Sequence, residues 1–122
     1  MAVTEDRTGY LNKIKWTWTC SSSGAYSEAT AYRYNGAIVE LVTIPTDGPT
    51  DDYDIAITDA DGADVLEGNG ANRDTTTTEY KKQTDGLGFV KSSLLTLGIT
   101  TAGDGKSGVV ILYVLDLDKE AH

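Results

Sequence analysis

The chain has 122 residues, 39% of them hydrophobic, and carries a formal net charge of -9 with a pI near 4.3. This length predicts one domain, residues 1–122, with a core of its own, and the composition excludes a disordered chain. The acidic balance argues against nucleic-acid and anionic-membrane partners, and the single cysteine, Cys20, excludes an intrachain disulfide.

The sequence shows no signal for secretion or membrane insertion. Residues 1–7 (MAVTEDR) contain neither the apolar stretch nor the cleavage pattern of a secretory signal. The longest apolar run, Val109–Leu115, is much shorter than the roughly 18–20 residues that a helix needs to cross a bilayer. We therefore expect a protein made in the cytosol, or carried elsewhere as part of a larger assembly.

Alternation of polar and apolar residues predicts strands in the first part of the chain. Ile14, Trp16, Trp18 and Cys20 alternate with polar residues, as in a strand with one face in water. A turn over 21–24 leads to a second predicted strand over 25–34. Asn-Gly at 35–36 then predicts a tight hairpin into a third strand over 37–44, which Pro45 is expected to end.

The middle of the chain is rich in turn residues. Residues 46–52 predict a loop, 53–58 a fourth strand, 59–62 an Asp-Gly turn and 63–66 a short fifth strand. A long polar excursion over 68–78 follows, and 80–83 predicts one more short strand.

Two late strands are predicted over 92–100 and 109–117, joined by a hairpin loop at 101–108. The second is apolar on both faces, which predicts a central position in a sheet or burial against a neighbouring subunit. Several short strands separated by turns indicate an all-β fold, a single-domain antiparallel β-sandwich or small barrel. Residues 1–10 are expected to form an N-terminal arm and 116–122 a C-terminal tail.

The inventory of reactive side chains argues against an enzyme. The only histidine is His122, at the last position, so a Ser-His-Asp arrangement, a Cys-His pair and a multi-histidine metal site are excluded. Cys20 shares a strand face with Trp16 and Trp18, and is expected to be a buried apolar residue. These two tryptophans are expected in the core, with a sugar-stacking platform as the alternative. No cofactor is expected.

The aspartates near the fourth strand carry the one metal hypothesis. Asp59, Asp61 and Asp64 could supply oxygen ligands to calcium, and they are the candidate ligands. Their spacing does not match the twelve-residue calcium loop, and an Asp-Gly hairpin turn accounts for the same residues.

Several segments resemble a recurring pattern in small virion proteins of tailed phages and prophages. They are Asn35–Thr43 with Pro45, then Thr50–Leu66, Gly70–Asp74 and Gly108–Tyr113, and the resemblance covers roughly residues 16–113, most of the chain. It implies a structural component of the virion, and foremost a capsid decoration (cement) protein that forms a homo-oligomer on the lattice of the major capsid protein.

Two other roles are kept beside this one. A head–tail junction or tail-fibre component is the near alternative, and a carbohydrate-binding β-sandwich at the host surface is the alternative from another class. Because recognition often lies in long polar loops, the candidate partner-binding residues are Asn69, Asn72, Arg73 and Asp74.

Overall fold

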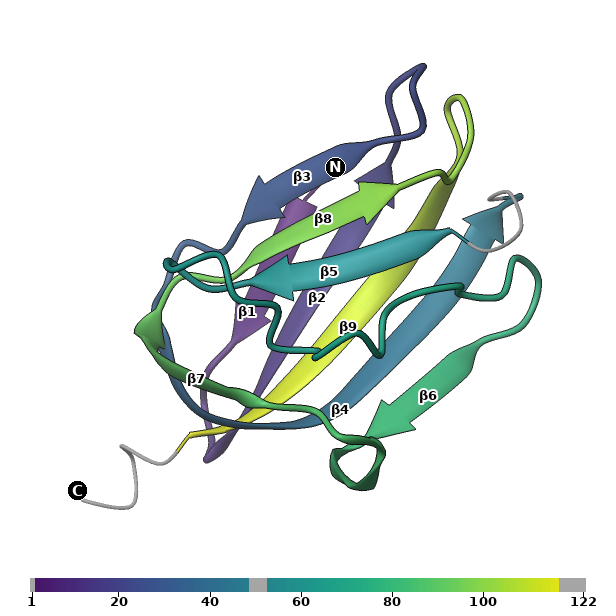
Figure 1. Ribbon diagram of the computed structural model, residues 1–122. Helices are drawn as coiled ribbons and strands as arrows, with labels where there is room; N and C mark the ends of the chain where they lie inside the picture. Colours follow the sequence, from purple (N-terminus) through teal and green to yellow (C-terminus); the bar gives the residue numbers. More distant parts are fainter. Residues whose placement is uncertain (1, 49–52, 117–122) are drawn as a thin grey trace.

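The computed structural model describes residues 2–48 and 53–116, which form a sandwich of two antiparallel sheets (Figure 1). The larger sheet has the order β1 (Ala2–Asp6), β2 (Leu11–Thr19), β9 (Ser107–Asp116), β4 (Tyr34–Asp47) and β6 (Glu79–Lys82), with β7 (Phe89–Ser93) also paired to β4. The smaller sheet has the order β3 (Tyr26–Ala29), β8 (Thr96–Thr100), β5 (Asp54–Thr58). A single 3-10 turn, Gln83–Asp85, joins β6 to β7. The predicted all-β sandwich is confirmed, and the described strands do not close into a barrel.

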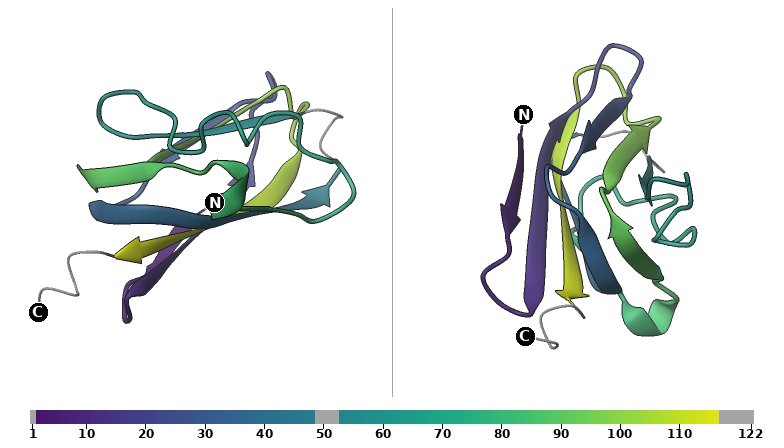
Figure 2. Two further views of the ribbon diagram at one scale, coloured as in Figure 1. Left: turned by 60° about the horizontal axis from the view of Figure 1, so that its bottom comes forward. Right: turned by 90° about the vertical axis from the view of Figure 1, so that its left-hand side faces the viewer.

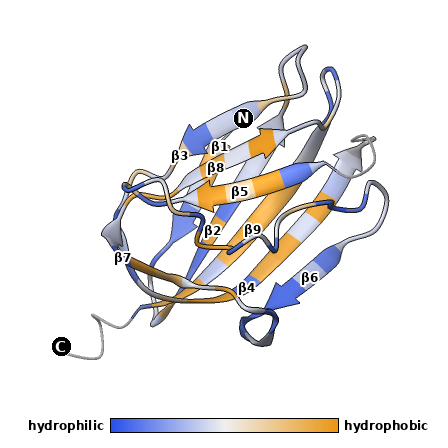
Figure 3. Cartoon of the chain, in the orientation of Figure 1, coloured by the Kyte–Doolittle hydropathy of each residue, from blue (hydrophilic) through white to orange (hydrophobic). Residues whose placement is uncertain are grey.

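The core lies between the two sheets, and period-two alternation fills it. Every second residue of β2 is buried, and the same holds for β5 and β9. Figure 3 shows the apolar residues concentrated on β9, β4 and β5, and Figure 2 shows the two layers edge-on. The largest side chains with almost no exposure are Trp16, Trp18, Tyr34 and Tyr53. As predicted, the doubly apolar strand β9 is central, between β2 and β4.

Residues 63–78, which follow the turn at 59–62 and include the predicted polar excursion, pack as a flap along the side of the sandwich. Val65 and Leu66 are buried in the core, and the Val65 amide donates to the Ile57 carbonyl at 2.8 Å. The prediction of a fifth strand over 63–66 is therefore wrong. The backbone turns inward there and buries these two side chains. Only an isolated bridge between Thr58 and Asp64 remains there.

Two connections cross between the sheets at one end of the sandwich. Residues 20–25 lead from β2 to β3, and residues 101–106 lead from β8 to β9, so that the predicted hairpin at 101–108 is wrong. The two connections bond to each other, with the Cys20 amide donating to the Lys106 carbonyl at 2.8 Å. A Cβ at Gly24, where φ is +77°, would lie 2.7 Å from the Gly103 nitrogen, so this contact requires glycine.

The hairpin predicted at Asn35-Gly36 is also wrong. Neither residue has a positive φ, and both lie inside the single long strand β4. Gly36 pairs with β7 on one side and β9 on the other, next to a register shift against β7. The Asn35 Oδ1 atom accepts the Ser92 amide at 3.1 Å, so the dipeptide serves a β-bulge instead of a turn.

Three predicted strand boundaries change for related reasons. The strand predicted over 25–34 ends at Ala29, because the chain crosses to the larger sheet before Tyr34. The strand predicted over 92–100 falls on two strands, β7 and β8, that lie in different sheets and are separated by residues 94–95. Ser92, near the end of β7, has a φ of +47°. Pro45 does not end β4, because a register shift between Pro45 and Asp47 accommodates a residue without an amide proton.

The first residues do not form a free arm. Residues 2–6 are β1, an edge strand paired with β2 from Asp6–Lys13 to Ala2–Thr17. The sequence did not predict this strand, because its charged residues Glu5 and Asp6 interrupt the apolar alternation, and charged residues are common in edge strands. Of the predicted tail 116–122, Asp116 is the last residue of β9 and the rest lies outside the described residues, as do 49–52 in the predicted loop.

Candidate functional site

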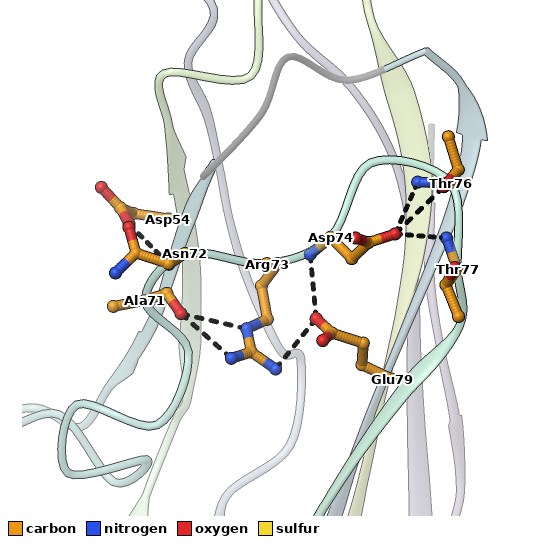
Figure 4. A network of polar contacts seen from close by, with 8 residues as sticks. All are labelled: Asp54, Ala71, Asn72, Arg73, Asp74, Thr76, Thr77 and Glu79. Atoms are coloured by element: carbon orange, nitrogen blue, oxygen red, sulfur yellow. Dashed lines mark hydrogen bonds and ion pairs between the residues drawn. The ribbon is translucent and has the colours of Figure 1, made fainter.

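The four predicted partner-binding residues lie in the flap between β5 and β6, in the polar network of Figure 4 and next to it. Asn69 is half-buried, and its Nδ2 atom donates to the Leu66 carbonyl at 2.9 Å. Asn72 is exposed with φ at +56°, and its amide donates to Asp54 Oδ1 at 2.9 Å. Both residues shape the flap, and Asn72 also presents its side chain to solvent.

Arg73 is buried and serves the fold. Its Nε and Nη2 atoms donate to the Ala71 carbonyl at 3.2 and 3.0 Å, and Nη1 lies 3.2 Å from Glu79 Oε1 (Figure 4). Its backbone forms a bridge with Tyr53. The guanidinium thus joins the flap to β6, and the Arg73 backbone joins it to Tyr53, just before β5. The side chain is buried and is not presented to a partner at the surface.

Asp74 is exposed and caps a turn of threonines. Its Oδ2 atom accepts the amides of Thr76 and Thr77 at 2.9 and 2.6 Å, and the Thr76 hydroxyl at 3.2 Å. These backbone hydrogen bonds hold the pKa of Asp74 below its ordinary value, so the side chain is an anion at neutral pH. Of the predicted residues, Asn72 and Asp74 therefore remain the exposed candidates for recognition.

The aspartates predicted to bind calcium cap backbone amides. Asp59 Oδ1 accepts the amides of Asp61 and Ala63, each at 3.0 Å. Asp64 Oδ1 accepts those of Ile57 and Leu66 at 3.2 and 3.0 Å, and its Oδ2 accepts that of Gly68 at 3.0 Å. Within residues 2–48 and 53–116, no three His, Cys, Asp or Glu side chains gather as metal ligands do.

A hollow of about 260 Å³ lies between the flap and the outer side of the smaller sheet. It brings together two aspartates, Asp54 and Asp64, and a hydrolase that acts through paired carboxylates would need such a pair. Both carboxylates already accept backbone amides. The remaining lining is small, with Ala56, Gly98 and Thr100 among it, and includes no histidine, cysteine or lysine. The hollow therefore presents no nucleophile paired with a base.

The tryptophans and the cysteine belong to the core, as expected. Trp16 and Trp18 are 0% exposed, so they form no platform for a sugar. The Trp16 Nε1 atom donates to the Glu28 carbonyl at 3.1 Å and joins the two sheets. Cys20 is buried, and its burial raises the pKa of the thiol, which opposes a role as nucleophile.

The feature that remains is the outer face of the larger sheet, which points away from the smaller one. Directly opposed residues of antiparallel strands point to the same side, so the register assigns the members of this face. They are Thr4, Asp6, Leu11, Lys13, Lys15, Thr17, Ala37, Glu40, Val42, Ile44, Tyr80, Lys82, Phe89, Val109, Ile111, Tyr113 and Leu115.

The outer face carries large exposed apolar side chains. Phe89 is 69% exposed, Tyr80 59% and Leu11 49%. Between them, the outward side chains of β9 are half-buried, and a hollow of about 340 Å³ opens beside Tyr113 and Val39. Exposed apolar side chains that gather on one face, here beside charged ones, are typical of surfaces that bind another molecule.

The strand register orders the outer face into rows. An apolar row contains Leu11, Leu115, Ala37 and Phe89. A charged row contains Asp6, Lys13, Tyr113, Glu40 and Lys82. A central row between the charged row and the start of β9 contains Thr4, Lys15, Ile111, Val42 and Tyr80.

Sequence reasoning detected one part of this face and missed the rest. The doubly apolar run of β9 indicated a surface covered by neighbours. Leu11, Tyr80 and Phe89 gave no signal, because each is a single apolar residue. Leu11 follows the predicted arm, Tyr80 lies in a short polar strand, and Phe89 precedes a predicted strand. Only the pairing of β2, β6 and β7 around β9 and β4 brings them together.

Comparison with known proteins gives no identification. The chain matches no protein-family model, no curated protein and no solved structure. None of the helical segments in the described part of the chain is long and apolar enough to span a membrane.

Proposed function

We propose that this chain is a non-catalytic structural protein of a tailed-phage virion, a capsid decoration protein that binds the outer surface of the shell. The resemblance over residues 16–113 names the class of protein. The observation that carries an assembly role is the apolar outer face of the larger sheet, with Leu11, Tyr80 and Phe89 exposed. A surface of this kind on a compact sandwich serves binding and needs no catalytic group.

Other properties of the chain support this role. The sandwich presents long polar connections on a rigid scaffold, as recognition surfaces often are. The net charge of -9 suits a part that stays outside the packaged DNA. In this proposal the protein is made in the host cytoplasm and is then carried on the virion, with the major capsid protein as its partner.

A head–tail junction or tail-fibre protein is the second candidate, because the same resemblance covers it. The carbohydrate-binding alternative has lost its basis, because the tryptophan pair that was to stack on sugar is buried.

Co-sedimentation tests the proposal and separates the two candidates. The purified protein is mixed with capsids lacking it, and in parallel with purified tails, from the phage or prophage that carries this sequence. Saturable co-sedimentation with capsids is expected. Binding to tails alone would replace decoration by the tail role, and binding to neither particle would overturn the virion role.

The flap supplies a matched pair of variants for the same assay. Asn72→Lys and Asp74→Lys change exposed side chains of the predicted contact. Asp61→Lys makes the same charge change as Asp74→Lys in an exposed turn outside that contact. Because Asp74→Lys also removes the cap of the threonine turn, weaker sedimentation of Asn72→Lys as well, with an unchanged Asp61→Lys control, would place the capsid contact on the flap.

A further inference from the structure

We propose that the outer face of the larger sheet binds the same face of a second copy of this chain, so that the two sandwiches pack as an isologous dimer. The inference deepens the assembly role proposed above and rests on it. It commits the apolar face to one occupant, and the reason is the order of charges across that face.

The charged row is antisymmetric about the central strand. Across the sheet from β1 to β6 it reads Asp6, Lys13, Tyr113, Glu40, Lys82, that is negative, positive, neutral, negative, positive. Read in the opposite direction, every charge meets one of the other sign. A row with this property is electrostatically complementary to itself.

A two-fold axis along β9 uses this property. Such an axis places β2 of one copy over β4 of the other and β1 over β6. Lys13 then faces Glu40 of the second copy, Asp6 faces Lys82, and Tyr113 meets its own equivalent. Each of these opposite-charge pairs occurs twice by symmetry, as an isologous interface requires. Within one copy, Lys82 Nζ already lies 2.9 Å from Glu40 Oε2. The dimer extends this ion pair into a network.

The apolar rows pack on the same axis. Ile111 and Leu115 lie on β9, so each meets its own equivalent at the centre of the interface. Leu11 comes to lie over Ala37 of the other copy, and Tyr80 lies over Thr4. Lys15, the one charged residue of the central row, lies over Val42 of the other copy. Stacked sheets align their strands within about 30° of each other, so rows of side chains meet approximately in this order.

The two kinds of row have different roles. Exposed ion pairs contribute only about 0–1 kcal/mol each, so they set the orientation of the copies. Removal of Leu11, Tyr80 and the half-buried side chains of β9 from water supplies the affinity. A hydrophobic face without the charge order would allow many registers, and the charged row selects one.

The test measures molecular mass in solution with two single variants. The wild-type chain is expected to run as a dimer with twice the mass of 13.0 kDa. Lys13→Glu alone places a second carboxylate over Glu40 of the other copy, and Glu40→Lys alone places a second ammonium group over Lys13. Each is expected to weaken the dimer about tenfold or more, since like charges across an interface are unfavourable.

Mixing the two variants gives the decisive result. In a mixed dimer, the carboxylate that Lys13→Glu introduces in one chain lies over the ammonium group that Glu40→Lys introduces in the other. The second pair in that dimer is the unchanged Lys13 over the unchanged Glu40. Equimolar mixing is therefore expected to restore the dimer that neither variant forms well alone. Arg33→Glu makes the same charge change as Lys13→Glu in the exposed connection between β3 and β4 and is expected to leave the dimer intact.

Several outcomes would overturn the inference. A monomeric wild type, a closed trimer, or a dimer that Lys13→Glu and Glu40→Lys leave unchanged would each refute it, as would a mixture no tighter than its parts. Both variants are expected to fold, because the two side chains point outward. Circular dichroism checks this. A wild-type monomer that sediments with capsids refutes the dimer alone, whereas a dimer that binds no particle refutes the virion role alone.

Discussion

Glu5 fastens the edge strand β1 to the connection between β3 and β4, and its removal gives the sharpest test of the fold. Its Oε2 atom accepts the Ala31 amide at 2.9 Å. Its Oε1 atom accepts the Tyr32 amide at 3.2 Å and the Tyr34 hydroxyl at 2.7 Å. The Arg7 guanidinium lies 4.5 Å from the centre of the Tyr32 ring and covers the same cluster. One carboxylate thus holds three donors from another part of the chain.

The expected cost of Glu5→Ala follows from the burial of those donors. Tyr34 is only 2% exposed, so its hydroxyl loses its acceptor away from water, which costs about 1–3 kcal/mol. Ala31 and Tyr32 are exposed, so their amides return to water, and each lost bond costs about 0.5–1 kcal/mol. We expect Glu5→Ala to lower the free energy of unfolding by about 3 kcal/mol, and Glu5→Gln by about 1 kcal/mol.

Urea unfolding of a double-mutant cycle isolates the buried bond. The cycle compares Glu5→Ala, Tyr34→Phe and the double variant. Because the two side chains are in contact, their coupling energy is expected to be about 1–2 kcal/mol. A coupling below about 0.5 kcal/mol, the level at which distant sites add, would refute the assignment of this bond as the fastening of β1.

Three further predictions test other parts of the structure by urea unfolding. Gly70→Ala places a Cβ 2.1 Å from the Ile55 carbonyl oxygen of β5, and should lower the free energy of unfolding by about 3 kcal/mol. In Gly98→Ala, the matched control, the nearest atom is the Ala56 carbonyl oxygen at 3.9 Å, so stability should change by less than about 1 kcal/mol. Burial raises the pKa of Tyr53 from 10.0 to about 12. The folded state therefore holds this proton more tightly, so the contribution of Tyr53 to stability should be constant below pH 10 and fall between pH 10 and 12, with a smaller fall in stability over that range in Tyr53→Phe. Trp16→Phe removes the bond to the Glu28 carbonyl and should cost about 1–2 kcal/mol, and no loss would contradict its role between the sheets.

Period-two alternation predicted the strands whose two faces differ most. In β2, Trp16 and Trp18 face the core while Lys15 and Thr17 face water, so the pattern is visible without the structure. In β1 it is not, because Glu5 points inward toward the two backbone amides and the Tyr34 hydroxyl that bind it. A charged residue on the inner face removes the contrast on which the prediction depends.

The Asn35-Gly36 hairpin failed because a local signal competed with the core. Tyr34 and Ile38 are both buried from the same strand, and β7 and β9 pair with it on either side. A turn at Asn35 would have removed one of these side chains from the core. The dipeptide is tolerated because a bulge also favours small or polar residues. Such long-range pairing is not visible in a window of a few residues.

The predicted contact residues show the same limit in the flap. Arg73 was expected at the surface because it lies in a polar loop, but the flap buries it against Tyr53 and Glu79. A segment that closes the side of a sandwich without strands leaves its own backbone groups to be satisfied, and polar side chains do this. Polarity in a loop therefore indicates internal bonding as readily as recognition.

The doubly apolar strand β9 carries the strongest functional information in this sequence. A two-layer sandwich needs one apolar face on each sheet, and Val110, Leu112 and Val114 already supply it for β9. Ile111 and Tyr113 then require another reason, and within the described chain no further layer covers them. We propose that another molecule supplies this third layer. Lys13 lies on one side of Tyr113 and Glu40 on the other, so the charges change sign across β9. This order favours the same face of a second copy as the third layer.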